Sequence, residues 1–255
     1  MTQIAGRVAG LWRHPVKSMQ GERLETAQLE QAGVPGDRRH GVVDAATGKV
    51  LSAKREPRLL EATARLDGDR LVVRLPGGDE RDDLGSRLDA DLSDWLERPV
   101  RLESAAAERP TQFEMRIDSE DESSTLVDLP CPPGTFFDLA PVHVLTTASL
   151  ATMADRYPGG EWDVARFRPT LLIETEGQEF VEDAWIGGEL RIGGAVLSPF
   201  MPTIRCVMTS KAQQGLGADV GIPKAVNAHH QGSLGIYATV ASPGAVAVGD
   251  ELTLG

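Results

Sequence analysis

The stretch Ile4–Arg13, IAGRVAGLWR, opens the chain with apolar and β-prone residues, and His14-Pro15-Val16 follows it directly. Such a run predicts a strand that ends in a bend near the proline. Comparable runs recur with turn signals between them, and they predict further strands at residues 24–29, 39–44, 49–52, 61–66, 71–75, 170–174, 189–197, 205–210, 235–241 and 250–254. We therefore expect a mostly β fold of the α+β class, with the strands in antiparallel barrels or sandwiches.

Helical spacing is found in two stretches. The first begins at Ser86, a residue type that caps helices, and ends before Pro99. Its apolar positions are Leu88, Leu92, Trp95 and Leu96. The second spans residues 147–156 and ends before Tyr157-Pro158. Few helices are thus expected.

The segment at residues 105–134 mixes acidic residues, serines and prolines with little apolar periodicity. This composition predicts a linker or mobile loop. We therefore divide the chain into residues 1–104, the linker at 105–134, and residues 135–255. A chain of 255 residues can bury the cores of one or two domains that pack closely.

The overall charge limits the kinds of partner. Twenty-six basic against 38 acidic residues give a net charge of −12, which opposes attraction to nucleic acid or to anionic lipid. The N-terminus lacks the pattern of a signal peptide, and no apolar run reaches the length of about 18 residues that a membrane span needs. We expect a cytoplasmic protein that binds neither nucleic acid nor membrane, and whose anionic ligands must meet a local basic pocket.

The two cysteines form neither a disulfide framework nor a C-x-x-C zinc pair. Cys206 follows Arg205 within an apolar, β-branched run at residues 203–209. Two interpretations are open from this local sequence. The thiol is a small core residue, or the neighbouring guanidinium favours the thiolate, the form that binds soft metals or attacks electrophiles.

Four basic positions stand where they could serve an anion site. Lys17 and Ser18 follow the bend after the first strand, Arg38 follows Gly36-Asp37, Arg168 precedes an apolar strand, and Arg205 adjoins the thiol. Taken singly, each is interpreted as an ordinary solvated or salt-bridged cation. Only their convergence would make a site.

The remaining candidate residues have plainer interpretations. His229 and His230 are expected in a polar loop without a third metal ligand, and His143 is expected as a hydrogen-bonded core histidine. Cys131 is expected to have no nearby cation and to be structural or incidental. Asp183 could orient a pocket group, or it could belong to a turn that places Trp185 in the core.

Several motifs together resemble a known family. In the N-terminal half these are His14-Pro15-Val16-Lys17-Ser18, Gly36-Asp37-Arg38-Arg39-His40 and Arg55-Glu56-Pro57-Arg58-Leu59. They are similar to the β-barrel domain that precedes MOSC domains, named for the C-terminal domain of molybdenum cofactor sulfurase. Further on, the motifs that resemble the MOSC domain itself are Phe167-Arg168-Pro169, Glu182-Asp183-Ala184-Trp185, Arg205-Cys206, Leu234-Gly235-Ile236-Tyr237 and Val248-Gly249-Asp250.

The resemblance implies a fold and a cofactor. An N-terminal MOSC-associated β-barrel at residues 1–104 would pack on a barrel-like MOSC domain at 135–255, with a ligand cleft between them. The implied cofactor is molybdopterin carrying molybdenum. In amidoxime-reducing members of the superfamily, the cysteine that matches Cys206 binds the metal, which would make it the metal ligand and catalytic residue here. The implied cofactor-binding residues are Lys17, Ser18, Arg38, Arg168, Thr170 and Arg205.

Two departures leave the activity open. Amidoxime-reducing relatives usually have asparagine where this chain has Thr170, and the residues after Cys206 also differ from theirs. Three hypotheses follow: an oxidoreductase that reduces N-hydroxylated or N-oxide small molecules, a sulfurtransferase that carries a Cys206 persulfide, and a non-catalytic cofactor carrier. A reductase would need a separate electron-transfer protein, because the chain has no cysteine-rich extension for an iron–sulfur cluster.

Overall fold

The computed structural model describes residues 4–82, 85–106, 112–116, 125–177 and 179–255. Strands make up most of the regular structure in these residues, which also contain three α-helices. The predicted mostly β fold is therefore confirmed.

Seven strands close into a barrel. In hydrogen-bonding order they are β12 (Leu171–Glu174), β11 (Val142–Thr146), β15 (Ser233–Ser242), β14 (Ala195–Ile204), β13 (Leu190–Ile192), β17 (Glu251–Leu254) and β1 (Ile4–Arg13), and β1 pairs again with β12. The barrel interior is filled by aliphatic side chains, such as Val8, Leu11, Ile173 and Leu252.

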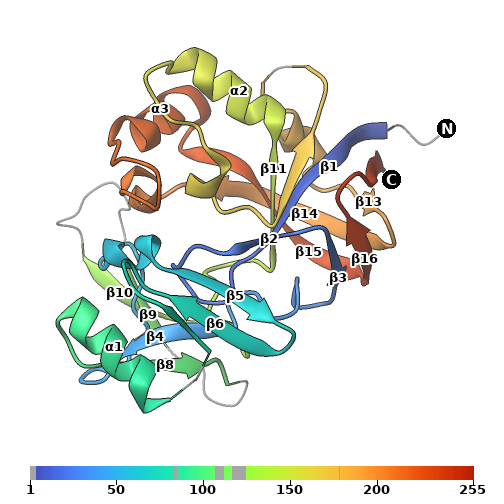
Figure 1. Cartoon of the computed structure of the whole chain (residues 1–255). Coiled ribbons are helices and arrows are strands. Elements are labelled where there is room, and N and C mark those ends of the chain that lie inside the picture. The colour runs from blue at the N-terminus through green and yellow to red at the C-terminus, as the bar shows by residue number, and fades with distance from the viewer. Residues whose placement is uncertain (1–3, 83–84, 107–111, 117–124, 178) are drawn as a thin grey trace.

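The first strand of the chain thus belongs to the same barrel as the last one. β1 is antiparallel to β12 on one side and to β17 on the other, and β2 (Glu22–Leu24) pairs with its far end. Nearby, β3 (Thr26–Leu29) pairs with β16 (Gly244–Ala247). The expected boundary at residue 104 therefore does not separate the two sets of strands. The chain leaves the barrel after Arg13, so the His-Pro-Val-Lys-Ser motif lies where the two parts meet (Figure 1).

The second part of the molecule is built from the intervening segments, drawn mainly in blue to green in Figure 1. β4 (His40–Asp44) pairs with β8 (Val100–Ser104), and β5 (Thr63–Asp67), β6 (Arg70–Arg74) and β7 (Glu80–Arg81) form a meander. The 3-10 helix η1 (Pro57–Glu61) and helix α1 (Ser86–Leu96) complete it. β9 (Gln112–Arg116) and β10 (Leu126–Pro130) form a hairpin within the expected linker.

Helix α1 packs through leucines spaced four residues apart. Leu88, Leu92 and Leu96 are buried in the core of this part, as their spacing predicted. The predicted cap at Ser86 is wrong, because Gly85 occupies the cap position and no side chain bonds the helix N-terminus. The helix ends at Glu97, which adopts a left-handed conformation two residues before Pro99.

One end of the barrel is covered by α2 (Thr147–Arg156) and α3 (Gly221–His230), which share a small core (Figure 1). The predicted helix at 147–156 is confirmed, and the hydroxyl of Thr146 caps it by accepting from the Ser149 N–H. Helix α3 was not predicted. His229 and His230 therefore lie at the end of a helix and not in a loop.

Four predicted strands have different structures. Residues 24–29 form two strands, and residues 189–197 turn at Gly193, where a side chain would lie 2.4 Å from an Asp250 carboxylate oxygen. Residues 205–210 contain the 3-10 helix η4 (Val207–Ser210), not a strand. The return at residues 49–52 makes one bridge, Val43 to Val50, on the edge of β4 opposite β8.

Candidate functional site at the junction of the two parts

Backbone hydrogen bonds bring the two N-terminal motifs together. The Lys17 N–H donates to the His40 carbonyl at 2.8 Å, and the His40 N–H donates to the Pro15 carbonyl at 3.0 Å. The Arg38 N–H donates to the His14 carbonyl at 2.7 Å. Segments more than twenty residues apart therefore hold the Lys17 and Arg38 side chains at one place.

Three of the predicted site residues have strained backbones. Ser18, Arg38 and Arg168 have φ angles of 71°, 48° and 52°, in the left-handed region that residues with a Cβ rarely adopt. Each such residue costs about 1–3 kcal/mol, and strain of this kind gathers at functional sites. Backbone strain in segments from both parts of the molecule therefore marks their junction as a candidate functional site.

Lys17 is buried, and its ammonium group contacts acceptors from residues 136–138. Its Nζ donates to the Phe136 carbonyl at 2.6 Å and pairs with Asp138, which also pairs with Lys54 at 3.1 Å. Burial disfavours the Asp138 carboxylate, but the two lysines outweigh burial and hold its pKa well below its usual range. Burial likewise lowers the pKa of Lys54, whereas Asp138 and then Cys206 raise it more. Lys54 therefore stays cationic.

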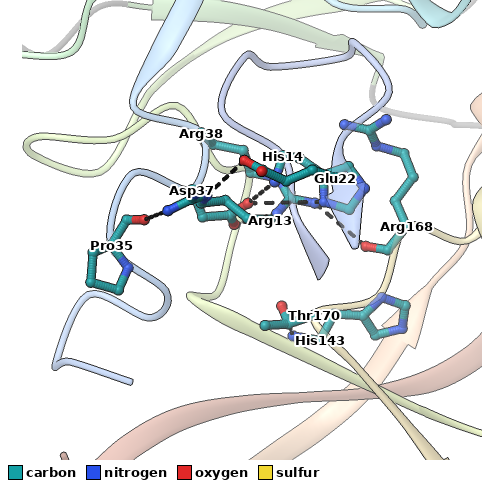
Figure 2. Close-up of polar contacts among 9 residues, drawn as sticks. All are labelled: Arg13, His14, Glu22, Pro35, Asp37, Arg38, His143, Arg168 and Thr170. Atoms are coloured by element: carbon teal, nitrogen blue, oxygen red, sulfur yellow. Dashed lines mark hydrogen bonds and ion pairs between the residues drawn. The ribbon is translucent and has the colours of Figure 1, made fainter. Parts of the chain in front are cut away.

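Asp37 fixes the neighbouring arginine. This buried carboxylate accepts from the His14 N–H at 2.6 Å and forms an ion pair with Arg38 (Figure 2). A second Arg38 nitrogen reaches the carbonyl of Arg168 at 3.5 Å, which links the two parts of the molecule. Burial, followed by the charges of Arg168 and Arg38, holds the pKa of His14 well below its ordinary value, so its ring is neutral at pH 7.

Arg168 is buried without a partner for its charge. Its side chain is 4% exposed, and neither terminal guanidinium nitrogen has a hydrogen-bond partner among the described residues. In Figure 2 its guanidinium points away from the drawn contacts, and only its backbone carbonyl is bonded. Burial and then the Arg38 cation lower the pKa of Arg168 from its ordinary value, while Asp37 and Asp138 offset part of this effect. A buried cation whose terminal nitrogens lack hydrogen-bond acceptors is costly, which makes Arg168 a candidate for binding an anion.

Arg168 borders a cavity of about 230 Å³ between the two parts. His14 also borders it, and its Nδ1 is a second buried atom with no partner among the described residues. The remaining lining residues are Trp12, Gln20, Gly21, Thr63, Val164, Ala165, Pro169 and Gln214. Unsatisfied donors beside a cavity are the arrangement expected of a ligand pocket.

Arg205 lies against the Phe-Arg-Pro motif. It donates to the Phe167 carbonyl at 3.0 Å, its guanidinium carbon lies 5.5 Å from the centre of the Phe167 ring, and its Nε has no partner among the described residues. Burial lowers the pKa of Arg205, while Tyr237 and Cys206 offset part of this effect. Cys206 is half-buried and precedes η4 as its cap residue. The free thiol thus lies in the field of Arg205 and Lys54.

Tyr237 is the aromatic residue of this cluster. Its ring makes an edge contact with His143 at a centroid distance of 5.8 Å. Gly235 permits the packing, because a Cβ there would lie 2.4 Å from His143 Nε2. Burial raises the pKa of Tyr237, with Arg205 opposing, so its hydroxyl keeps its proton at neutral pH. Burial, followed by Arg205, lowers the pKa of His143, as fits its predicted place in the core.

The predicted site residues differ in what they contact. Lys17, Arg38, Arg168, Arg205 and Cys206 belong to one electrostatically linked cluster. The Ser18 hydroxyl accepts from the Ala53 N–H at 2.9 Å, and the Thr170 hydroxyl accepts from the His143 N–H at 3.1 Å. These two hydroxyls hold the backbone of the segments that carry the charged groups.

Sequence reasoning missed four members of the cluster: His14, Lys54, Asp138 and Tyr237. His14 and Tyr237 lie inside motifs that were recognised, and Lys54 immediately precedes another. Asp138 had no local signal, because its importance comes from two lysines 84 and 121 residues away.

The other candidates are accounted for locally. His230 bonds the Ser233 carbonyl and Asp183, both at 2.7 Å, and stacks on Phe180. Trp185 is in the core, as expected. Cys131 is buried, but Lys17 is close enough to influence it, so the expectation of no nearby cation is wrong. In the parts of the chain that the structure describes, no three His, Cys, Asp or Glu side chains are grouped to hold a metal ion.

Two family profiles match almost the whole chain. The profile of the MOSC N-terminal beta barrel domain matches residues 5–127, and that of the MOSC domain matches residues 133–253. The mitochondrial amidoxime reducing component 2 of Bos taurus is 25% identical over 232 residues, covering 82% of this chain and 67% of the bovine protein. The mitochondrial amidoxime-reducing component 1 of Homo sapiens is 26% identical over 242 residues, with the same coverage.

A solved structure shares the fold. The YUAD protein from Bacillus subtilis superposes with a TM-score of 0.51 at 12% identity, covering 100% of this chain and 98% of that protein. No helix within the described ranges is both long enough and apolar enough to cross a bilayer. The two profile matches together extend from the first barrel strand to the last. The chain therefore belongs to the family of MOSC-domain proteins, with a MOSC N-terminal beta barrel domain preceding the MOSC domain.

Proposed function

We propose that this protein binds a molybdenum cofactor at the junction and acts as an oxidoreductase on N-hydroxylated or N-oxide small molecules. The observation that carries the proposal is the buried, unpartnered guanidinium of Arg168, in one cluster with the Cys206 thiol. An anionic ligand rich in sulfur, with a metal that accepts a thiolate, fits both features. The amidoxime-reducing relatives support the choice of substrate.

The residues present fit the anionic end of such a cofactor. Arg168 and Arg205 have buried nitrogens without hydrogen-bond partners among the described residues, and Arg38, from an N-terminal motif, reaches the Arg168 carbonyl. A phosphate would supply the missing acceptors, and guanidinium groups match its geometry. Lys17 and Lys54 are engaged with Asp138, so they would contribute charge at longer range.

The chain's own groups would orient the ligand and set the local charge. When bound, the molybdenum cofactor supplies two-electron, oxo-transfer chemistry, and Cys206 would be the metal ligand that the protein contributes. Arg205 and Lys54 are both close enough to Cys206 to interact with it electrostatically. Tyr237 keeps a proton on its hydroxyl within this charged cluster and can donate a hydrogen bond to a substrate oxygen. The electrons would come from a separate electron-transfer protein.

The decisive experiment measures molybdenum and pterin content. The protein is purified from a host that makes the cofactor, beside Cys206→Ala and the matched control Cys131→Ala, which removes the other thiol. We expect close to one molybdenum per chain in the wild type and in Cys131→Ala, and loss of the metal in Cys206→Ala. Turnover of an N-hydroxylated compound with a competent electron donor should follow the metal.

Two other outcomes would replace the proposal. A protein that lacks molybdenum but carries sulfane sulfur, lost in Cys206→Ala, would be a sulfurtransferase. A protein with bound molybdopterin that turns over no N-hydroxylated compound would be a cofactor carrier.

A further inference from the structure

A second buried arginine lies two residues before Arg168. Arg166, at the end of the 3-10 helix η2 (Val164–Arg166), is fully buried, with 0% of its side chain exposed. Its Nε donates to the Glu161 carbonyl at 2.9 Å, and one terminal nitrogen pairs with the Glu161 carboxylate at 3.2 Å. This arginine therefore has the acceptors that Arg168 lacks.

The other Arg166 contacts all go to the segment that follows Cys206. The guanidinium donates to the Gly217 carbonyl at 2.7 Å, and to the carbonyls of Thr209 and Lys211 at 3.4 Å each. These carbonyls come from η4 and the irregular stretch after it. Thr209 is buried and Lys211 is half-buried, and a carbonyl that loses its donor away from water is costly, so this one side chain stabilises the conformation of residues 209–217 at three points.

The segment held by Arg166 is bonded directly to Cys206. Thr209 donates to the Cys206 carbonyl from its N–H and from its hydroxyl, both at 3.1 Å. Thr209 is buried, so this turn cannot shift without disturbing its packing. A continuous chain of hydrogen bonds thus runs from Arg166 through Thr209 to the backbone of Cys206.

We propose that Arg166 is a positioning residue for Cys206, because it holds residues 207–217 and, through Thr209, the backbone that carries the thiol, so that loss of Arg166 loosens this segment and makes the thiol more accessible. The metal-ligand role of Cys206 rests on the proposed function above. The positioning itself does not, because it concerns the metal-free chain. A merely structural arginine would stabilise the whole barrel, whereas this one should act first on one segment.

The test uses metal-free protein with Cys131→Ala, which leaves Cys206 as its one thiol. Hydrogen exchange of residues 207–217 and the rate of Cys206 alkylation by iodoacetamide are measured in Arg166→Lys, which keeps the charge but loses the planar fork. We expect both rates to rise about tenfold, with exchange in the barrel strands unchanged. Arg166→Met should give a larger effect than Arg166→Lys.

Two further variants separate the steps. Thr209→Val removes the hydroxyl bond to Cys206, so alkylation should accelerate while exchange at residues 211–217 keeps its wild-type rate. Arg156→Lys is the matched control, because Arg156 bonds the carbonyl of His229, outside this segment. It should change neither rate. The proposal is overturned if Arg166→Lys leaves both rates unchanged, or accelerates exchange equally in every barrel strand.

Metal content then distinguishes the two proposals. If the wild type holds molybdenum, Arg166→Lys should retain less of it during dialysis. If the wild type holds none, the proposed function fails, but the exchange and alkylation results still decide the role of Arg166.

Discussion

Arg166 and Arg168 are two residues apart and both buried, yet they differ in what surrounds their charge. Arg166 has four backbone carbonyls and a carboxylate within hydrogen-bond distance. Neither terminal nitrogen of Arg168 has a partner in the described part of the chain, and another cation, Arg38, lies close to it. Burial alone therefore does not define the role of an arginine, because one of these two has its hydrogen-bond acceptors and the other lacks them.

The difference shows where a ligand is needed. A buried charge with all its acceptors stabilises the segments that supply them. A buried charge without hydrogen-bond acceptors destabilises the protein, and a bound anion would supply the acceptors. Arg166 therefore stabilises the fold, whereas Arg168 is the candidate for binding an anion.

The largest effect is expected from Arg166→Met. This change leaves four carbonyls without their buried donor, so the free energy of unfolding should fall by about 3–5 kcal/mol. Denaturant unfolding of the metal-free protein measures it. A loss below about 1 kcal/mol would mean that water replaces the guanidinium, and the contrast with Arg168 would fail.

Acid should lower the folding stability of the protein through two buried histidines near the arginine cluster. The pKa values of His14 and His143 are held well below 6.5, first by burial and then by nearby arginines. Below about pH 6.5 these histidines become protonated in the unfolded chain but stay neutral in the folded protein. The free energy of unfolding therefore falls by about 1.4 kcal/mol per pH unit for each histidine. Unfolding at pH 7 and pH 5.5 measures the slope.

Replacing one of these histidines should flatten that slope. His14→Phe should lose less stability between pH 7 and pH 5.5 than the wild type, by about 1 kcal/mol. His229→Asn is the control, because the His229 side chain is exposed at the end of α3. Equal slopes in all three proteins would contradict the assignment of a neutral, buried His14.

A smaller effect is expected from Glu161→Gln. The Glu161 side chain is 61% exposed, and an ion pair with so exposed a carboxylate contributes about 1 kcal/mol or less. Thermal unfolding should therefore change little, although the partner arginine is fully buried. A loss as large as that of Arg166→Met would mean that the carboxylate, not the carbonyls, satisfies Arg166.

The fold class, most strands and the charged side of the site could be predicted from the sequence. Motifs with lysine, arginine and cysteine carry local signals, and they led to Lys17, Arg38, Arg168, Arg205 and Cys206. Closure of the barrel has no local signal in the sequence, because β1 pairs with strands that begin far away, at residues 171 and 251. The β-branched run after Arg205 predicted a strand, but the Thr209 bonds to Cys206 favour a 3-10 turn.

Arg166 could not be distinguished from Arg168 in the sequence. Its partners are backbone carbonyls as far as 51 residues away, and carbonyls are the same in every residue type. The two roles become separable only when the acceptors are located in space.

The most direct test of this distinction is the effect of Arg168→Met on stability with and without ligand. Denaturant unfolding is compared for the metal-free and the cofactor-loaded protein. We expect the substitution to raise the stability of the metal-free protein by about 1 kcal/mol, because it removes a buried cation whose terminal nitrogens lack hydrogen-bond acceptors, and to lower that of the loaded protein. A loss of several kcal/mol in the metal-free protein, as for Arg166→Met, would contradict a guanidinium that awaits an anion.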